Sequence, residues 1–152
     1  MARPWIAMAF ILCIAPCLSA KQQLAARCPN LSGHYMIQGE DGQVHIYVQQ
    51  DACDRIVIER RTSYLGKITT EKHSLRLDGK PQVDMAWLAQ SGKAETSAKF
   101  EGDVLRVVTK ADSSVSQATM KWNYSLTARR NLLEDLLLND QRHGGPLEAT
   151  RQ

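Results

Sequence analysis

Apolar and polar residues alternate with a period of two through most of this chain, and this alternation limits the possible folds more than any other feature. In the segment QVHIYVQQ, Val44, Ile46 and Val48 share one face, and in QATMKWNYSLT the aromatic residues Trp122 and Tyr124 do the same. Such alternation marks strands of an antiparallel sheet that has one buried face. Turns containing Gly or Asp separate the runs roughly every 8–12 residues, which is typical of all-β sandwiches and barrels.

These patterns predict eight strands, at residues 33–38, 43–50, 55–62, 73–77, 83–90, 94–100, 103–109 and 117–127. Consecutive hairpins favour an antiparallel up-and-down meander, and closing the meander into a small barrel removes both exposed sheet edges. We therefore expect an all-β fold with one barrel domain over residues 21–140.

The segment after residue 130 departs from strand periodicity. Leucines recur there at helical spacing, and Asn131 with Glu134 three places later resembles a helix-capping pair. The leucines are Leu132, Leu133, Leu136 and Leu137. The pattern favours a short C-terminal helix over 131–139, with a ninth strand as the alternative. Residues 141–152 show no periodicity and are predicted to form a disordered tail.

The N-terminus has the features of a secretory signal peptide over residues 1–20. Arg3 provides a positive start, residues 5–15 are apolar, and small residues suitable for cleavage lie at 18–20. The apolar run is too short to span a bilayer, so no stable membrane anchor is expected. These features predict a secreted or periplasmic protein.

Removal of that segment leaves two of the four cysteines, Cys28 and Cys53. Two cysteines in an exported chain are most simply explained by one disulfide, and two unpaired thiols are the alternative. No histidine stands at ligand spacing beside either cysteine, which argues against a metal pair.

Several function classes lack their sequence signals. A net charge of +3 without a basic stripe gives no nucleic-acid footprint. There is no nucleophile elbow, no HExxH and no phosphate-binding loop, so we expect neither an enzyme nor a cofactor. His34 and His45 could meet across the first hairpin, but without a third ligand we expect no metal site. The charged runs 59–61 and 134–135 are interpreted as solvated.

The stretch CPNLSGHY, from Cys28 to Tyr35, resembles the opening of lipocalins and avidin-like proteins. It enters the first predicted strand with the pattern Leu-x-Gly-x-aromatic. The resemblance implies that Gly33 lets the chain turn under the barrel and that Tyr35 plugs the closed end. The later WNYSL, beginning at Trp122, is similar to the closing strand of small exported bacterial proteins that share this start.

The expected function is binding of a small apolar ligand inside the barrel by an exported, monomeric, non-enzymatic protein. For the interior itself a filled core is favoured over an open lumen, because eight strands enclose a space that side chains can fill. The alternative function is a loop-mediated interaction with a secreted protein, such as inhibition of a protease or lysozyme. The candidate lumen residues are Val44, Ile46, Val48, Met85, Trp87, Phe100, Trp122 and Tyr124.

Overall fold

The computed structural model describes residues 28–83, 93–112 and 117–152. The predicted signal peptide and the lumen candidates Met85 and Trp87 lie outside these residues. Within the described ranges, no helix is long and apolar enough to cross a membrane.

The described residues form strands and no helix. The strands are β1 (Gly33–Gln38), β2 (Gly42–Asp51), β3 (Arg55–Tyr64), β4 (Lys67–Arg76), β5 (Gln82–Val83), β6 (Lys93–Glu101), β7 (Val104–Asp112), β8 (Gln117–Leu126), β9 (Leu132–Leu138), β10 (Gln141–Arg142) and β11 (Leu147–Arg151). Ten of them follow one another in the order β4-β3-β2-β1-β11-β9-β8-β7-β6-β5, and β10 pairs with the side of β9. Every pairing is antiparallel.

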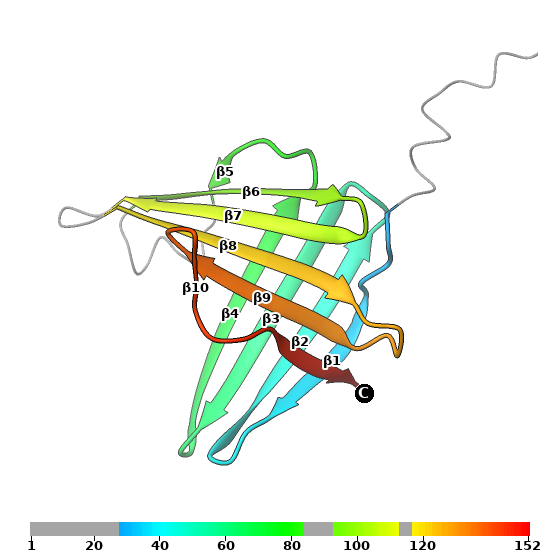
Figure 1. Ribbon diagram of the computed structural model, residues 1–152, viewed down its shortest axis with the longest axis vertical. Helices are drawn as coiled ribbons and strands as arrows, with labels where there is room; N and C mark the ends of the chain where they lie inside the picture. Colours follow the sequence, from blue (N-terminus) through cyan, green and yellow to red (C-terminus); the bar gives the residue numbers. More distant parts are fainter. Residues whose placement is uncertain (1–27, 84–92, 113–116) are drawn as a thin grey trace, which may run out of the picture.

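The sheet curls into a nearly closed barrel. Figure 1 shows β1–β4 crossing behind β6–β9 at a steep angle, with the β1–β2 and β3–β4 hairpins projecting below β9 and β11. The two ends of the strand order meet near the β4–β5 connection, where the Gly79 N–H donates to the Ala98 carbonyl at 2.9 Å. The barrel is therefore nearly closed, and at one of its ends one sheet extends past the other.

The core follows from the alternation of each strand, because every second side chain points into the barrel. Its largest fully buried members, from seven strands and the segment before β1, are Leu31, Tyr35, Ile46, Ile56, Leu75, Leu105, Leu132, Thr96 and Thr109. Ile37, Val44, Phe100, Trp122 and Leu126 are partly buried and pack against the core.

Most of the strands predicted from alternation are confirmed, with ends that agree within a few residues. β4 is longer than predicted and begins at Lys67, because its first half is exposed on both faces and so carries no alternation of apolar residues. Of the strand predicted at 83–90, only the first residue belongs to a described strand, β5, and the remainder lies outside the described residues.

The prediction of a helix over 131–139 is wrong, and the alternative of a ninth strand is confirmed. These residues form β9, which pairs with both β8 and β11. Leu132 points into the core, while Leu133 and Leu137 on the opposite face are half-buried. Because both faces of β9 are partly covered, its leucines occur in two adjacent runs, 132–133 and 136–138, and this spacing imitates that of a helix.

The prediction of a disordered tail over 141–152 is also wrong. β10 and β11 lie in this segment, and Ala149 of β11 is fully buried. β11 is inserted between β1 and β9, with Tyr35 opposite Arg151 and Leu132 opposite Ala149. A strand of five residues with one buried side chain has too little local pattern to be recognised without its neighbours. The meander thus has ten strands rather than eight.

The predicted disulfide between Cys28 and Cys53 is confirmed, with the two Cα atoms 5.7 Å apart and the two residues separated by 25 positions in sequence. It ties the segment before β1 to the turn between β2 and β3. Closing a loop of this length contributes roughly 3–4 kcal/mol in the chain-entropy model.

Candidate functional site

The interior of the barrel divides into a filled closed end and a polar layer. Of the predicted lumen residues, Ile46, Val48 and Tyr124 belong to the buried core, whereas Val44, Phe100 and Trp122 are partly buried beside it. The structure therefore brings the described candidates together around one interior. At the closed end the side chains fill the space themselves.

Tyr35 is fully buried at that closed end, close to Leu31. Its hydroxyl donates a hydrogen bond to the Leu31 carbonyl at 2.8 Å, which anchors the segment before β1. The ring covers Gly33, and a Cβ atom added there would lie 3.1 Å from the Tyr35 ring. Gly33 is needed because this ring occupies the space that a side chain would take.

A buried ion pair crosses the lumen above this core. Arg60 of β3 donates from Nη2 to Oε2 of Glu134 on β9, and their side chains are 21% and 2% exposed. The guanidinium also lies over the Trp122 ring, 5.4 Å from its centroid. The pair links the two halves of the barrel through its interior, so the interpretation of residues 134–135 as solvated is wrong for Glu134.

Burial is the largest influence on the pKa values of Glu134 and Tyr124 in this polar layer. It raises the pKa of Glu134, against the opposing influence of the Arg60 charge and of the neighbouring Tyr124 hydroxyl. Burial also raises the pKa of Tyr124 well above its usual value, with the Glu134 charge acting in the same direction. Oε1 of Glu134 is buried without a hydrogen-bond partner among the described residues. The layer therefore contains an acceptor that the described part of the fold leaves unused.

A small cavity adjoins the ion pair on the side of β4, β7 and β8. It has a volume of about 30 Å³ and is bordered by Arg60, Glu71, His73, Trp122 and Tyr124 together with apolar side chains. This volume suffices for one or two water molecules. This cavity beside the ion pair is therefore too small for a ligand of the expected kind.

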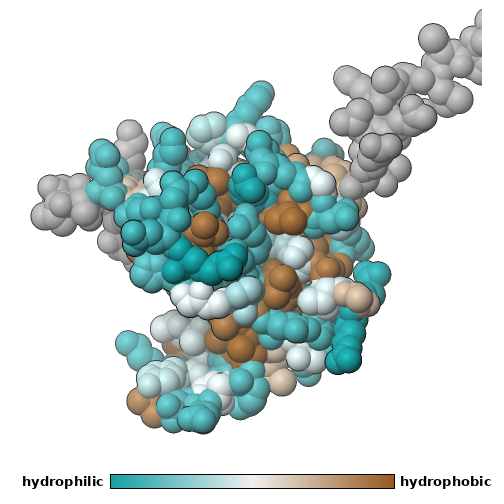
Figure 2. All heavy atoms as spheres, viewed as in Figure 1, coloured by the Kyte–Doolittle hydropathy of each residue, from teal (hydrophilic) through white to brown (hydrophobic). Residues whose placement is uncertain are grey.

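A much larger hollow, of about 300 Å³, opens where the β1–β2 and β3–β4 hairpins project from the body. Its walls include Ile37, Val44 and Thr62, and the acidic residues Glu40 and Asp41 lie at its edge. Figure 2 shows apolar atoms in the recess between the hairpin ends and the rest of the molecule. Thr62 and Arg60 lie two positions apart on one face of β3, so the hollow leads toward the ion pair.

The histidine pair considered from the sequence is found on the outside of the barrel. His34 Nε2 and His45 Nδ1 lie 2.9 Å apart, and the His34 ring stacks on Tyr47 with centroids 4.4 Å apart. Burial, reinforced by the neighbouring His45, lowers the pKa of His34. No cluster of three or more metal-ligating side chains occurs among residues 28–83, 93–112 and 117–152.

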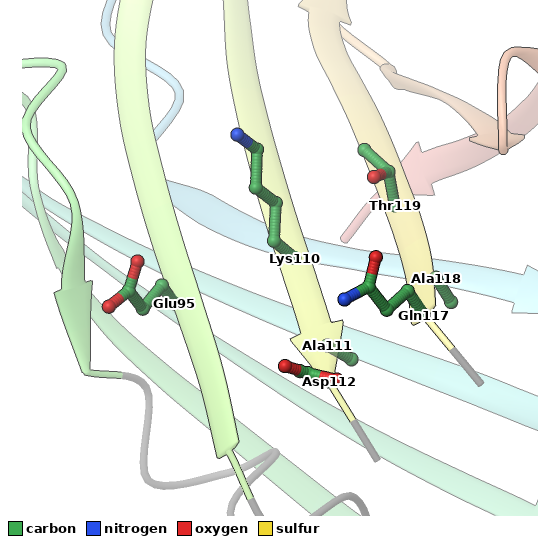
Figure 3. Close-up of a pocket in the computed structure, with 7 residues that line it drawn as sticks. All are labelled: Glu95, Lys110, Ala111, Asp112, Gln117, Ala118 and Thr119. Atoms are coloured by element: carbon green, nitrogen blue, oxygen red, sulfur yellow. The ribbon is translucent and has the colours of Figure 1, made fainter. Parts of the chain in front are cut away.

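A second surface recess, of about 250 Å³, lies where the ends of β6, β7 and β8 meet. Figure 3 shows the Lys110 amine pointing away from the carboxylates of Glu95 and Asp112, so the charged groups do not converge on one point. The recess borders residues 113–116, which lie outside the described structure.

Sequence reasoning missed Arg60, Glu71 and Glu134, although the alternation of β3 contains the signal for the first. Arg60 follows Ile56 and Ile58 at spacings of two, so a regular strand places all three on the buried face. Glu134 could be found only after the strand character of β9 was known.

No protein-family model matches the chain, and no curated protein is significantly similar to it in sequence. The expected antiparallel barrel is confirmed, whereas membership of a lipocalin-like family stays a prediction.

Proposed function

We propose that this is an exported, non-enzymatic barrel that binds a small amphipathic amine in the open-end hollow, which leads toward the polar layer of Arg60, Glu71 and Glu134. The observation that carries the proposal is the charged layer inside the barrel, which lies next to an open hollow with apolar walls. Ligand sites in proteins combine mostly apolar walls with a few placed polar groups.

The buried charges support this interpretation because stability alone does not account for them. A buried ion pair is often no more stabilising than apolar side chains of similar volume, and one carboxylate oxygen of Glu134 has no described partner. A donor from a ligand would satisfy that oxygen. Retaining such a group in a small barrel is therefore consistent with a binding role.

The charges around the hollow favour a positively charged head group. Glu40 and Asp41 lie at its edge, and Glu71 and Glu134 lie in the layer beneath it, against the single guanidinium of Arg60. This local excess of acid contrasts with the net charge of +3 for the whole chain. The hollow has a volume at the lower end of the range for ligand sites, so the apolar body must be short.

Fluorescence of Trp122 tests the proposal, because its ring contacts Arg60 in the polar layer. A Trp87→Phe background makes Trp122 the only tryptophan outside the predicted signal peptide. Octylamine, octanol and octanoate would be titrated separately, since they share a chain length and differ in charge. We expect a saturable change with octylamine, weaker binding of octanol, and the weakest of octanoate.

Variants locate the site. Glu71→Gln and Glu134→Gln should weaken octylamine binding, while Glu101→Gln, an exposed carboxylate on β6, should not. Equal affinity for the amine and the carboxylate would contradict the assignment of the head group. No saturable response to any of the three compounds, with an intact fold by circular dichroism, would reject a binding role for the hollow.

A further inference from the structure

One edge of the barrel is open along the first half of β4. Figure 1 shows no strand on the outer side of β4 near its turn with β3. The far end of β4 is occupied, because the Gln82 side-chain amide donates to the Arg76 carbonyl at 3.1 Å and accepts from the Arg76 N–H at 3.0 Å. This amide takes the place of a neighbouring strand at Arg76 only.

The contact with Gln82 also shows which backbone groups point outward. In an antiparallel strand, alternate residues direct their N–H and C=O groups to the same side. Because Arg76 points to the outer edge, so do Lys72, Thr70 and Ile68, and no described residue hydrogen bonds to their backbone groups. An exposed edge of this kind is a template for pairing with another chain, and most proteins protect it.

Exposed apolar side chains gather at the same place. Tyr64, Leu65 and Ile68 are 54%, 75% and 72% exposed, and together they are three of the five large exposed apolar residues in the described structure. Leu65 also has a φ of 47° in the turn, a left-handed conformation that favours glycine or asparagine. The two-residue β3–β4 turn requires this conformation, since Gly66 has a φ of 76° as well, but the exposure of the Leu65 side chain does not benefit the isolated barrel.

The sequence of this edge is complementary to itself. If two copies pair antiparallel about Thr69, Lys67 of each copy lies opposite Glu71 of the other, and the two charge pairs form on one face. On the other face, Ile68 lies opposite Thr70 of the second copy, which places two β-branched residues in contact. A register centred on Thr70 would instead place Ile68 opposite Lys72 and form no opposite-charge pair.

We propose that β4 is a homodimer interface in which residues 67–71 of two copies form a continuous antiparallel ladder centred on Thr69. This pairing gives partners to the open backbone groups and covers Ile68. It replaces the expectation of a monomer. Glu71 also borders the polar layer of the proposed ligand site, so the variants at Lys67 and Thr70, which line neither that cavity nor the hollow, distinguish failure of the dimer from failure of the ligand site.

Sedimentation of the mature protein over a range of concentrations tests the dimer, and charge exchange tests its register. Lys67→Glu and Glu71→Lys should each weaken dimerisation by about tenfold or more, because both place like charges opposite each other twice. The double variant Lys67→Glu/Glu71→Lys should restore it. Arg129→Glu, an equal charge change on the exposed β8–β9 turn, should have no effect.

A cross-link tests the centre of the register. In the proposed ladder Thr69→Cys faces its own copy, so mild oxidation should give a disulfide-linked dimer, and Ser74→Cys should give far less. Thr70→Pro should give a monomer with a nearly unchanged melting temperature, because the N–H of Thr70 points away from β3. A monomer at all concentrations would overturn the proposal, as would a dimer that is unaffected by the charge variants or by Thr70→Pro.

Discussion

Arg60 and Glu134, which stand 74 positions apart in the sequence, form an ion pair across the interior of the barrel. The two residues belong to strands on opposite sides of the lumen, β3 and β9. Their contact joins the two halves of the molecule above an apolar core. The predictions below begin with this pair.

Removing Arg60 should be costly at neutral pH. Arg60→Met leaves the Glu134 carboxylate buried without its cation, and we expect a loss of about 3–5 kcal/mol in the free energy of unfolding. The double variant Arg60→Met/Glu134→Leu should recover most of this loss, because an apolar pair can replace a buried ion pair. Urea unfolding at pH 7 measures both. Arg61→Met, on the exposed face of β3, is the matched control and should change the midpoint little. A double variant as unstable as the single one would contradict this account.

The raised pKa of Glu134 predicts a pH dependence of defined sign. The folded chain holds this proton more tightly than the unfolded chain, whose carboxyl has a pKa near 4.5. The contribution of Glu134 to stability is therefore greatest below that pH and falls as the pH rises through the folded pKa. Urea unfolding from pH 4 to pH 8 should show the wild type losing stability relative to Glu134→Gln as the pH rises. The opposite trend would mean that Arg60 outweighs burial.

Tyr35 and Gly33 predict a steric coupling at the closed end. Gly33→Ala brings a Cβ atom to 3.1 Å from the Tyr35 ring and should cost about 1–3 kcal/mol, as overpacking does. The cost should shrink in a Tyr35→Leu background, which removes the ring. Gly145→Ala is the control, because a Cβ atom there meets nothing within 4 Å. Thermal unfolding of the wild type, Gly33→Ala, Tyr35→Leu and the double variant gives the coupling energy between the two positions. Additive effects of the two substitutions would show that the strain lies elsewhere.

Closure of the barrel depends on β11, and a single buried position tests this. Ala149→Asp puts a charge where no side-chain atom is exposed and should destabilise the barrel by about 3–5 kcal/mol. Thr150→Asp, the adjacent exposed position, should have a small effect. The melting temperatures of Ala149→Asp and Thr150→Asp measure the difference between the buried and the exposed position. Similar values for both would show that β11 is not held in place between β1 and β9.

The sequence predicted those parts of the fold in which one face of a strand is apolar and the other polar. β2 and β8 are examples, because their alternation is local and independent of their neighbours. β9 was assigned to a helix because leucines cover both of its faces, and its strand character depends on pairing with β8 and β11. Long-range pairing leaves no trace in a short window of sequence.

The same limit applies to the candidate site. Gly33 and Tyr35 were recognised because both belong to one short motif. Arg60 and Glu134 were interpreted as solvated because each stands beside other charged residues, and nothing local distinguishes the inward-pointing member of such a run. The alternation of β3 could have identified Arg60, whereas its partner required the topology of the whole sheet.

The position of β11 has a consequence for how the molecule is made. Ribosomes synthesise β11 after every other strand described, yet it pairs with β1, the first of them. The earlier strands can form hairpins while the chain emerges, but β1 keeps an unpaired edge until residues 147–151 are released. Contacts that span so much sequence slow folding and prolong exposure of that edge. The nascent protein therefore depends on protection from aggregation until its synthesis is complete.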